Sequence, residues 1–316
     1  MTKKKVCHIL KSSINNSSRV YSQKELDGGT FLDKSSLINF ALLFTKPASN
    51  IYVFHQHAML INLILFYFKC TFISIPKRPR IVFDVHDLNE CKGPFLSKHF
   101  FHYIIHMSAE YVAFILPNIT FMTVSKGLSR VLFKRYKKTV LVVPNLCKPV
   151  VFNNENKHCR KVIYFGQINE RRIPISFIKN LNDIGFEVDL YGVFSGEGAD
   201  QYKSTLRDLY PGSYKGSYNA NNIQNIVSQY HFSLLYIKSN KVNIRFCLPN
   251  KLFQSLSVGV PCIISPELHE VNLTFRGKGV FTFPDLDLTK EKMKFNYRVY
   301  YDSFSSRYLR FLGQTT

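Results

Sequence analysis

Short apolar runs alternate with segments of helical periodicity along most of the chain. In the first half, the runs of strand-like length are VCHIL (6–10), NIYVFHQ (50–56), RIVFDVHD (80–87), TFMTVS (120–125) and VLVVPN (140–145). Between these runs, apolar residues recur at helical spacing over 58–69, 98–116 and 126–137. Ser125 is placed as the N-cap of the last of these helices. Strands that alternate with helices are typical of βαβ units and a parallel sheet.

The alternation stops in the polar, asparagine-rich segment 146–160 and then starts again. The second series of strand-like runs is KVIYFG (161–166), FEVDLYG (186–192), GSYKGSY (212–218), HFSLLYI (231–237), VPCIISP (260–266) and GVFTFP (279–284), with helical spacing over 174–184, 199–209, 221–229 and 249–258. The pattern predicts an α/β chain of two Rossmann-like domains, residues 1–150 and 151–287. A helical tail over 288–316 is expected to pack back toward the first domain. Two such domains are expected to face each other across a cleft, where ligands bind at the carboxyl ends of the strands.

The charge of the chain is large and unevenly distributed. The net charge is +21, and residues 1–150 carry 21 Lys and Arg against 7 Asp and Glu, while the remainder carries 21 against 14. Such a surplus attracts nucleic acid, anionic lipid or an acidic substrate. The aromatic residues, 15% of the chain, lie within apolar runs and are not interleaved with basic residues, so we expect no nucleic-acid partner.

Cysteine usage and hydropathy bear on the compartment. The seven cysteines are scattered and form no C-x-x-C pair, which predicts reduced thiols in a cytoplasmic protein. The most apolar stretch, 58–75, is interrupted by Lys69 and is followed by Pro76, so it is too short for a membrane-spanning helix.

The second domain holds the most informative motifs. They follow in the order I-Y-F-G-Q-I-N-E-R-R (163–172), D-L-Y-G (189–192), K-G (215–216) and L-P-N-K-L-F-Q-S-L-S-V-G-V-P-C-I (248–263). This ordered set resembles the donor-binding domain of GT-B glycosyltransferases, particularly the family 4-like enzymes of bacterial capsule, O-antigen and lipopolysaccharide assembly. In the first domain, F-D-V-H-D (83–87), T-V-S (123–125) and V-V-P-N (142–145) resemble that family's acceptor domain.

The predicted donor site begins at Gly166, where a strand ends and the backbone can approach a ligand closely. The turn that follows carries Arg171 and Arg172. The resemblance implies that a basic residue of this turn holds the diphosphate of a nucleoside-diphosphate sugar, and the planar fork of arginine pairs well with phosphate oxygens. Lys251 lies in the first turn of a predicted helix, where the helix dipole disfavours a cation, so its position indicates an anionic partner.

Pro249, Asn250 and Gln254 complete the predicted donor site. The resemblance implies that the start of this helix faces the sugar and phosphates, and that a later acidic position holds the ribose hydroxyls. Gln254 stands at that acidic position, and Phe246 stands where the family has the first of two glutamates. An amide can hydrogen-bond a diol without charge assistance, so the donor sugar and the stereochemical outcome stay open.

His86 and Asp87, at the end of F-D-V-H-D, are the predicted catalytic residues. A histidine can donate a hydrogen bond to a sugar hydroxyl or accept the acceptor's proton. The alternative is a His–Asp pair with a structural role. Arg19, in the predicted loop after the first strand, is a candidate on the acceptor side.

No metal site is predicted. The other histidines have no paired ligand spacing, and His55 and His57 are expected to point to one face of a strand end. The Asp-Leu-Asp triplet at 285–287 follows the second domain and is expected in a solvated loop. No cofactor is expected beyond the nucleoside-diphosphate sugar, which acts as a substrate.

The sequence therefore predicts a metal-independent glycosyltransferase that moves a sugar onto a glycan acceptor, lipid-linked, in surface polysaccharide synthesis. The charge of the first domain predicts peripheral binding to the anionic inner face of the cytoplasmic membrane. The alternatives are a sugar-nucleotide epimerase of the same fold and a non-catalytic basic binding or scaffold protein.

Overall fold

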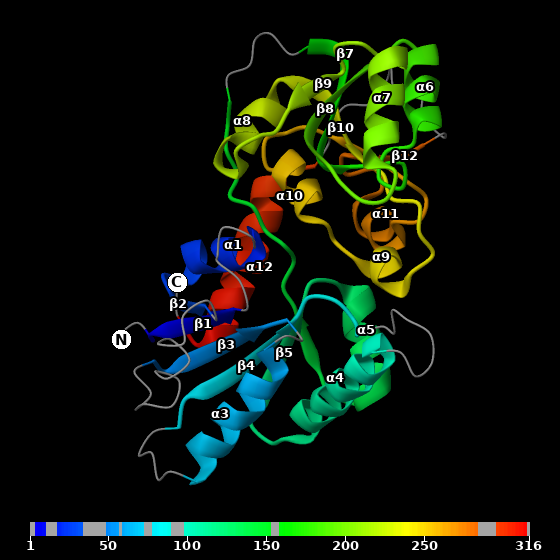
Figure 1. The fold of residues 1–316 in the computed structure, drawn as a ribbon. Coiled ribbons are helices and arrows are strands. Elements are labelled where there is room, and N and C mark those ends of the chain that lie inside the picture. The colour runs from blue at the N-terminus through cyan, green and yellow to red at the C-terminus, as the bar shows by residue number, and fades with distance from the viewer. Residues whose placement is uncertain are drawn as a thin grey trace. The chain divides into compact units, whose positions relative to one another are not determined.

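The computed structural model describes residues 4–10, 18–33, 49–56, 59–72, 78–89, 98–152, 158–283 and 295–314 (Figure 1). The chain divides into two compact units. The first unit combines Met1–Leu146 with Asp302–Thr316, and the second unit is Cys147–Tyr301. Each unit contains one sheet of six parallel strands with helices between the strands, which confirms the predicted α/β class.

The first unit is a doubly wound domain. Its elements are β1 (Val6–Leu10), α1 (Ser18–Asp27), β2 (Thr30–Asp33), β3 (Ile51–His55), α3 (Leu60–Phe72), β4 (Arg80–Val85), α4 (Lys98–Ile115), β5 (Ile119–Thr123), α5 (Lys126–Tyr136) and β6 (Val140–Val142). The strand order is β2-β1-β3-β4-β5-β6, and each neighbouring pair is parallel. Every residue of β1 and β3 is buried, because helices cover both faces of a parallel sheet.

The second unit repeats this architecture. Its elements are β7 (His158–Ile168), α6 (Ile175–Asp183), β8 (Glu187–Phe194), α7 (Ala199–Leu209), β9 (Tyr214–Gly216), a 3₁₀ turn (Ala220–Asn222), α8 (Ile223–Ser228), β10 (Tyr230–Leu235), α9 (Val242–Phe246), α10 (Asn250–Leu256), β11 (Cys262–Ile264), α11 (His269–Phe275) and β12 (Val280–Thr282). The strand order is β12-β11-β10-β7-β8-β9, again with parallel neighbours.

The C-terminal helix α12 (Tyr297–Leu312) contributes to both units. At its start, the Tyr297 hydroxyl donates to the Cys147 carbonyl at 2.7 Å and accepts from the Cys147 amide at 3.0 Å. Near its end, Tyr308 and Leu312 are fully buried in the core beneath the first sheet. The beginning of the predicted tail, 288–294, and the Asp-Leu-Asp triplet that precedes it lie outside the described residues.

Most elements begin and end close to their predicted positions. Ser125 is the N-cap of α5, as predicted, and its hydroxyl accepts from the Leu128 amide at 3.1 Å. Of the twelve described strands, only β2 was not predicted. Helix α1 was also not predicted, because its sequence SRVYSQKELD carries few apolar residues to reveal a helical period. Arg19 therefore lies in a helix and not in the loop expected after β1.

Strands β7 and β8 approach closely at two glycines that are register partners, Gly166 and Gly192. Their φ angles of 125° and 145° lie in a region that other residues rarely adopt. A Cβ atom on Gly192 would collide with the Gly166 carbonyl oxygen. The carboxyl ends of both strands therefore depend on the absence of a side chain here.

We expect Gly192→Ala to lower the free energy of unfolding by about 2 kcal/mol more than Gly212→Ala, because the first change adds a backbone collision to the strain of a positive φ. Gly212 has φ 81° and open space around it, so it is a matched control. Urea unfolding followed by circular dichroism measures both variants, since the chain contains no tryptophan. Equal losses would contradict the close approach.

Candidate functional site

Polar side chains gather at the carboxyl edge of the first sheet. His8 on β1, His55 on β3 and Asp84 on β4 are all buried, and the parallel register pairs His55 with Asp84. His86 follows directly after β4. The carboxyl ends of parallel strands are where doubly wound domains bind their ligands, so this edge is the first candidate site.

Arg19 compensates the buried carboxylate of Asp84. Its Nη2 donates to Asp84 Oδ1 at 2.6 Å and its Nε donates to Oδ2 at 2.8 Å, while Nη1 donates to the Val143 carbonyl. Burial alone would raise the pKa of Asp84, but the Arg19 guanidinium and the neighbouring histidines outweigh burial and hold that pKa well below its ordinary value. The predicted acceptor-side residue Arg19 thus has its guanidinium engaged inside the first unit.

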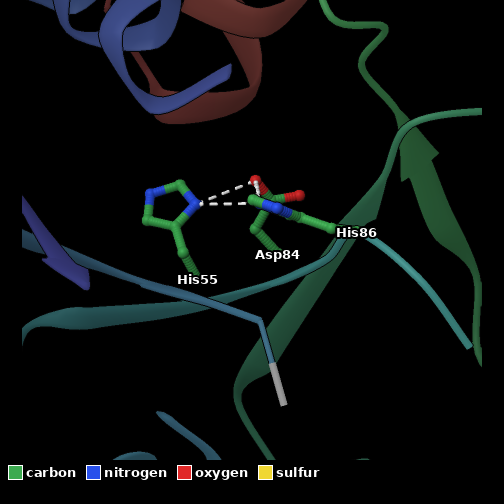
Figure 2. Close-up of side chains that lie close together, drawn as sticks. All are labelled: His55, Asp84 and His86. Carbon is green, nitrogen blue, oxygen red and sulfur yellow. Dashed lines mark hydrogen bonds and ion pairs between the residues drawn. The ribbon is translucent and has the colours of Figure 1, made fainter. Parts of the chain in front are cut away.

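His55 and His86 both lie against the same oxygen of Asp84 (Figure 2). His55 Nδ1 and His86 Nε2 are each 3.0 Å from Asp84 Oδ2, and the two nitrogens are 3.3 Å apart. On its other side, His55 Nε2 is 2.9 Å from His8 Nδ1, and His8 Nε2 is 3.1 Å from Asp27 Oδ2. Burial lowers the pKa of His55 to about 3, which favours the neutral imidazole.

Asp27 closes this chain of contacts at the end of α1. It accepts from the Gly29 amide at 2.7 Å and from the Tyr308 hydroxyl at 2.8 Å. Burial raises the pKa of Tyr308 well above its ordinary value, so the hydroxyl remains a donor. A continuous series of polar contacts therefore connects α12 to the end of β4 through α1, β1 and β3.

The structure separates the two residues predicted to be catalytic. His86 is mostly buried against Asp84, whereas Asp87 is exposed in the bend that follows. The aspartate that pairs with His86 is thus Asp84, two residues earlier, and not Asp87. Side chains two residues apart share one face of a strand, so the period of F-D-V-H-D already contained this signal. Sequence reasoning also missed His55, because its partners come from other strands.

The second candidate site is at the carboxyl edge of the second sheet and is centred on Lys251. The Lys251 ammonium lies 4.4 Å from the centroid of the Tyr164 ring. A Cβ atom on Gly166 would collide with Lys251 Nζ and would lie 2.5 Å from Cε, so glycine makes room for the lysine. Burial, and to a smaller extent Arg172, lower the pKa of Lys251 to about 7.

Arg172 lies in the turn after β7, where its amide donates to the Asn169 carbonyl at 3.0 Å. Arg171, the neighbouring residue, is exposed. Among the residues that the structure describes, neither Arg172 nor Lys251 forms an ion pair with a carboxylate. Two cations held close together without an acidic partner create a positive potential that favours an anion.

The remaining predicted donor residues surround the start of α10. Pro249 precedes the helix, Asn250 begins it, and Gln254 lies one turn later and is half-buried. Within the described parts of the chain, the buried Asn250 Oδ1 has no hydrogen-bond donor. The same is true of Glu267 Oε2, just after β11, a residue that sequence reasoning did not select.

Comparisons with known proteins bear on the fold. Neither a protein-family model nor a curated protein matches this sequence. Similar solved structures include an α-glucosyltransferase in complex with UDP and a 13-mer DNA containing a HMU base, at 13% identity over 100% of this chain and 96% of that chain, with a TM-score of 0.58. Sucrose-phosphate synthase from Thermosynechococcus elongatus is similar at 11% identity over 98% of this chain and 95% of that chain, with a TM-score of 0.59. AviGT4, a glycosyltransferase involved in avilamycin A biosynthesis, is similar at 9% identity over 97% of this chain and 92% of that chain, with a TM-score of 0.54.

This chain has the GT-B fold. The similarity extends over nearly the whole length of each pair and includes both Rossmann-like domains, as predicted from the ordered motifs. In the GT-B chain, the Asp84 cluster belongs to the first Rossmann-like domain and the Lys251 site to the second.

We expect Arg19→Met to lower the free energy of unfolding by about 3 kcal/mol, because it leaves the buried Asp84 carboxylate without its main cation. The double change Arg19→Met with Asp84→Leu should lose less than the sum of the two single changes, because it removes both charges together. Urea unfolding of the four proteins measures this coupling. Additive losses would show that the two side chains act independently.

Proposed function

We propose that this protein is a glycosyltransferase that takes its sugar from a nucleoside-diphosphate sugar. The observation that carries the proposal is the half-buried ammonium of Lys251, which lies beside Arg172 at the carboxyl edge of the second sheet and forms no ion pair with any carboxylate that the structure describes. The GT-B fold supports the proposal. An α-glucosyltransferase of this fold, 12% identical in sequence to this chain, was solved in complex with UDP-glucose. A diphosphate supplies the negative charge that the two cations lack within the described chain.

The proposed chemistry rests on stabilising the departing nucleoside diphosphate. Arg172 can bind phosphate oxygens with two parallel hydrogen bonds, and Lys251 adds a positive charge from the side of Gly166. Both cations are positioned before the reaction, so they stabilise the charge that develops on the leaving group without reorganisation. Asn250 Oδ1 and Glu267 Oε2 are buried acceptors, which suits them to receive hydrogen bonds from sugar or ribose hydroxyls.

The acceptor is proposed to bind at the carboxyl edge of the first sheet, near His86 and Asp87. A glycan acceptor, lipid-linked and used in surface polysaccharide synthesis, is proposed from the motif resemblance to family 4-like enzymes. The exposed carboxylate of Asp87 is available to an acceptor hydroxyl, whereas Asp84 is enclosed by Arg19 and the histidines. No step of the proposed transfer requires a metal ion.

Donor binding should be coupled to proton uptake. The amino group of Lys251 has a pKa of about 7, so it is mostly neutral at pH 8. A bound diphosphate raises that pKa toward the ordinary lysine value. We expect UDP-glucose binding at pH 8 to take up nearly one proton. Lys251→Met should abolish that uptake and weaken binding at least about tenfold.

Isothermal titration calorimetry in buffers of different ionisation enthalpy measures both quantities. Lys179→Met is the matched control, because Lys179 is exposed on α6 of the same unit. It should leave affinity and proton uptake unchanged. Unaltered binding by Lys251→Met would remove the basis of the proposed donor site.

The first unit presents two exposed apolar stripes on adjacent helices. Helices α3 and α4 pack against one another and lie side by side in Figure 1. The exposed large apolar residues of α3 are Ile61, Leu65, Phe68 and Phe72, and those of α4 are Phe101, Ile104, Ile105, Tyr111 and Ile115. Their spacing follows the helical repeat, so each set forms a continuous surface. None of the described helices is long and apolar enough to cross a membrane.

Helix α5 contacts α4 and adds positive charge beside this surface. Its sequence and the two residues that follow, KGLSRVLFKRYKK, contain no acidic residue, and Lys126, Arg130 and Lys134 are exposed at helical spacing. Apolar side chains next to a row of cations match a membrane surface with anionic headgroups. We therefore propose that the first unit binds peripherally to such a membrane, which would bring lipid-linked acceptors to the site.

Co-sedimentation measures binding to anionic vesicles, and we expect two independent sets of substitutions to weaken it. Arg130→Glu with Lys134→Glu should weaken binding at least about tenfold, since each cation near an anionic surface contributes about 1 kcal/mol. Phe68→Ser with Phe72→Ser should weaken it by removing inserted apolar area. The controls Arg207→Glu and Leu209→Ser change exposed residues of α7 in the second unit and should have no effect.

Raised salt should weaken binding of the wild-type protein, because it screens exposed charges. Recovery of all proteins in the supernatant would contradict the membrane proposal. Retention on duplex DNA without vesicle binding would instead favour a nucleic-acid acceptor, in keeping with the DNA in the solved α-glucosyltransferase complexes.

A further inference from the structure

Asp84 Oδ2 has more nitrogen neighbours than it can accept hydrogen bonds from. Arg19 Nε lies at 2.8 Å, Gln23 Nε2 at 3.1 Å, and His55 Nδ1 and His86 Nε2 at 3.0 Å each. A carboxylate oxygen offers about two lone pairs. The arginine donates at the shortest distance and takes one position, so Gln23, His55 and His86 compete for the other. The two imidazole nitrogens therefore cannot both be donors to this oxygen.

The protons of the histidine series lead to the same result. Asp27 is an acceptor, so His8 Nε2 must carry a proton to contact it at 3.1 Å. A neutral His8 then accepts through Nδ1 from His55 Nε2 at 2.9 Å. A neutral His55, with its proton on Nε2, turns the lone pair of Nδ1 toward Asp84 Oδ2 and His86 Nε2. The lone pair of His55 Nδ1 then faces a carboxylate oxygen at 3.0 Å, and two acceptors at this distance repel each other unless a cation lies between them.

The three converging atoms have the separations of metal ligands. Asp84 Oδ2 is 3.0 Å from both His55 Nδ1 and His86 Nε2, and these two nitrogens are 3.3 Å apart (Figure 2). The three residues come from the ends of adjacent strands. Ligand bonds of about 2.0–2.1 Å place ligand atoms about 3.3 Å apart in tetrahedral geometry and about 3 Å apart in octahedral geometry. One ion would replace two strained contacts at Asp84 Oδ2 by a single bond.

We propose that His55, Asp84 and His86 bind a divalent transition-metal ion through these three atoms. Two imidazoles and one carboxylate suit zinc and its neighbours in the first transition row, and not magnesium or calcium. Asp84 would bind the ion directly, and Asp27 adds a second carboxylate behind it, in contact with His8 Nε2 at 3.1 Å. His8 would then orient the His55 ring by its contact with His55 Nε2, and Asp27 would hold His8 in place.

The ion would join the end of β3 to the end of β4 and would fix the position of His86. It forms no bond to the donor or the acceptor in the proposed sugar transfer, and its site is in a different unit from the Lys251 site. The proposal therefore stands or fails independently of the proposed function. It also departs from the sequence expectation, which found no spacing of ligands along the chain.

The test uses the untagged full-length protein, freed of metal by a chelator and then titrated with cobalt(II) or zinc(II). We expect one ion per chain by calorimetry and a visible absorption band for the cobalt complex, with no competition from magnesium. His86→Gln should weaken binding at least about 100-fold, and Asp27→Asn, which removes the carboxylate in contact with His8, at least about tenfold.

A matched control addresses surface histidines. His102 and His106 lie one turn apart on α4, with ring centroids 4.2 Å apart, and could bind an ion adventitiously. Replacing both with Gln should leave the stoichiometry and affinity unchanged. Loss of binding in that variant, with retention in His86→Gln, would overturn the proposal.

A second readout covers the case in which His86→Gln does not fold. Imidazole ¹⁵N spectra of the wild-type protein should show one ring nitrogen of His55 changing on zinc addition, with UDP-glucose affinity measured separately on the same preparation. A wild-type protein that binds neither cobalt nor zinc, and whose spectra show a proton shared between His8 and His55, would overturn the metal site.

Discussion

Asp84 lies near the carboxyl end of β4, an interior strand of the first sheet, and its side chain is fully buried. An isolated charge in such a place would be prohibitively unstable, so the surrounding chain has to supply compensating groups. Arg19 does so with two hydrogen bonds, and its third nitrogen holds the Val143 carbonyl beyond β6. This one ion pair thereby connects α1, β4 and the segment after β6. Helix α12 joins the same arrangement through Tyr308 and Asp27.

The two units surround their buried charged groups differently. In the first unit, the carboxylate of Asp84 is matched by a guanidinium and surrounded by imidazoles. In the second unit, the Lys251 ammonium is placed against aromatic rings and beside a second cation, Arg172. A charge that the protein itself compensates contributes to structure, whereas a charge left uncompensated can be used for a ligand. This contrast supports the proposal that the donor phosphates bind in the second unit.

Glycine has a specific role at this second site. Gly166 gives Lys251 its space, and Gly192 allows the neighbouring strand to approach the Gly166 carbonyl. The two residues pair across β7 and β8, so one local requirement for absent side chains serves both the sheet and the cation. The fold of this strand end and the proposed donor site therefore depend on the same two glycines, whereas the polar cluster of the first unit is assembled from side chains of several elements.

The sequence alone determined the alternation of strands and helices, the two Rossmann-like domains and the residues around Lys251. It could do so because periodicity and turn chemistry are local, and because Gly166, Arg172 and Lys251 lie in motifs that can be read along the chain. Only the tertiary structure decided that Asp84, and not Asp87, is the partner of His86, and that Arg19 is occupied by Asp84. It also brought His8, His55 and Asp27 into one cluster. These residues come from β1, β3 and α1, and their proximity depends on strand order and register, which no local pattern in a single sequence encodes.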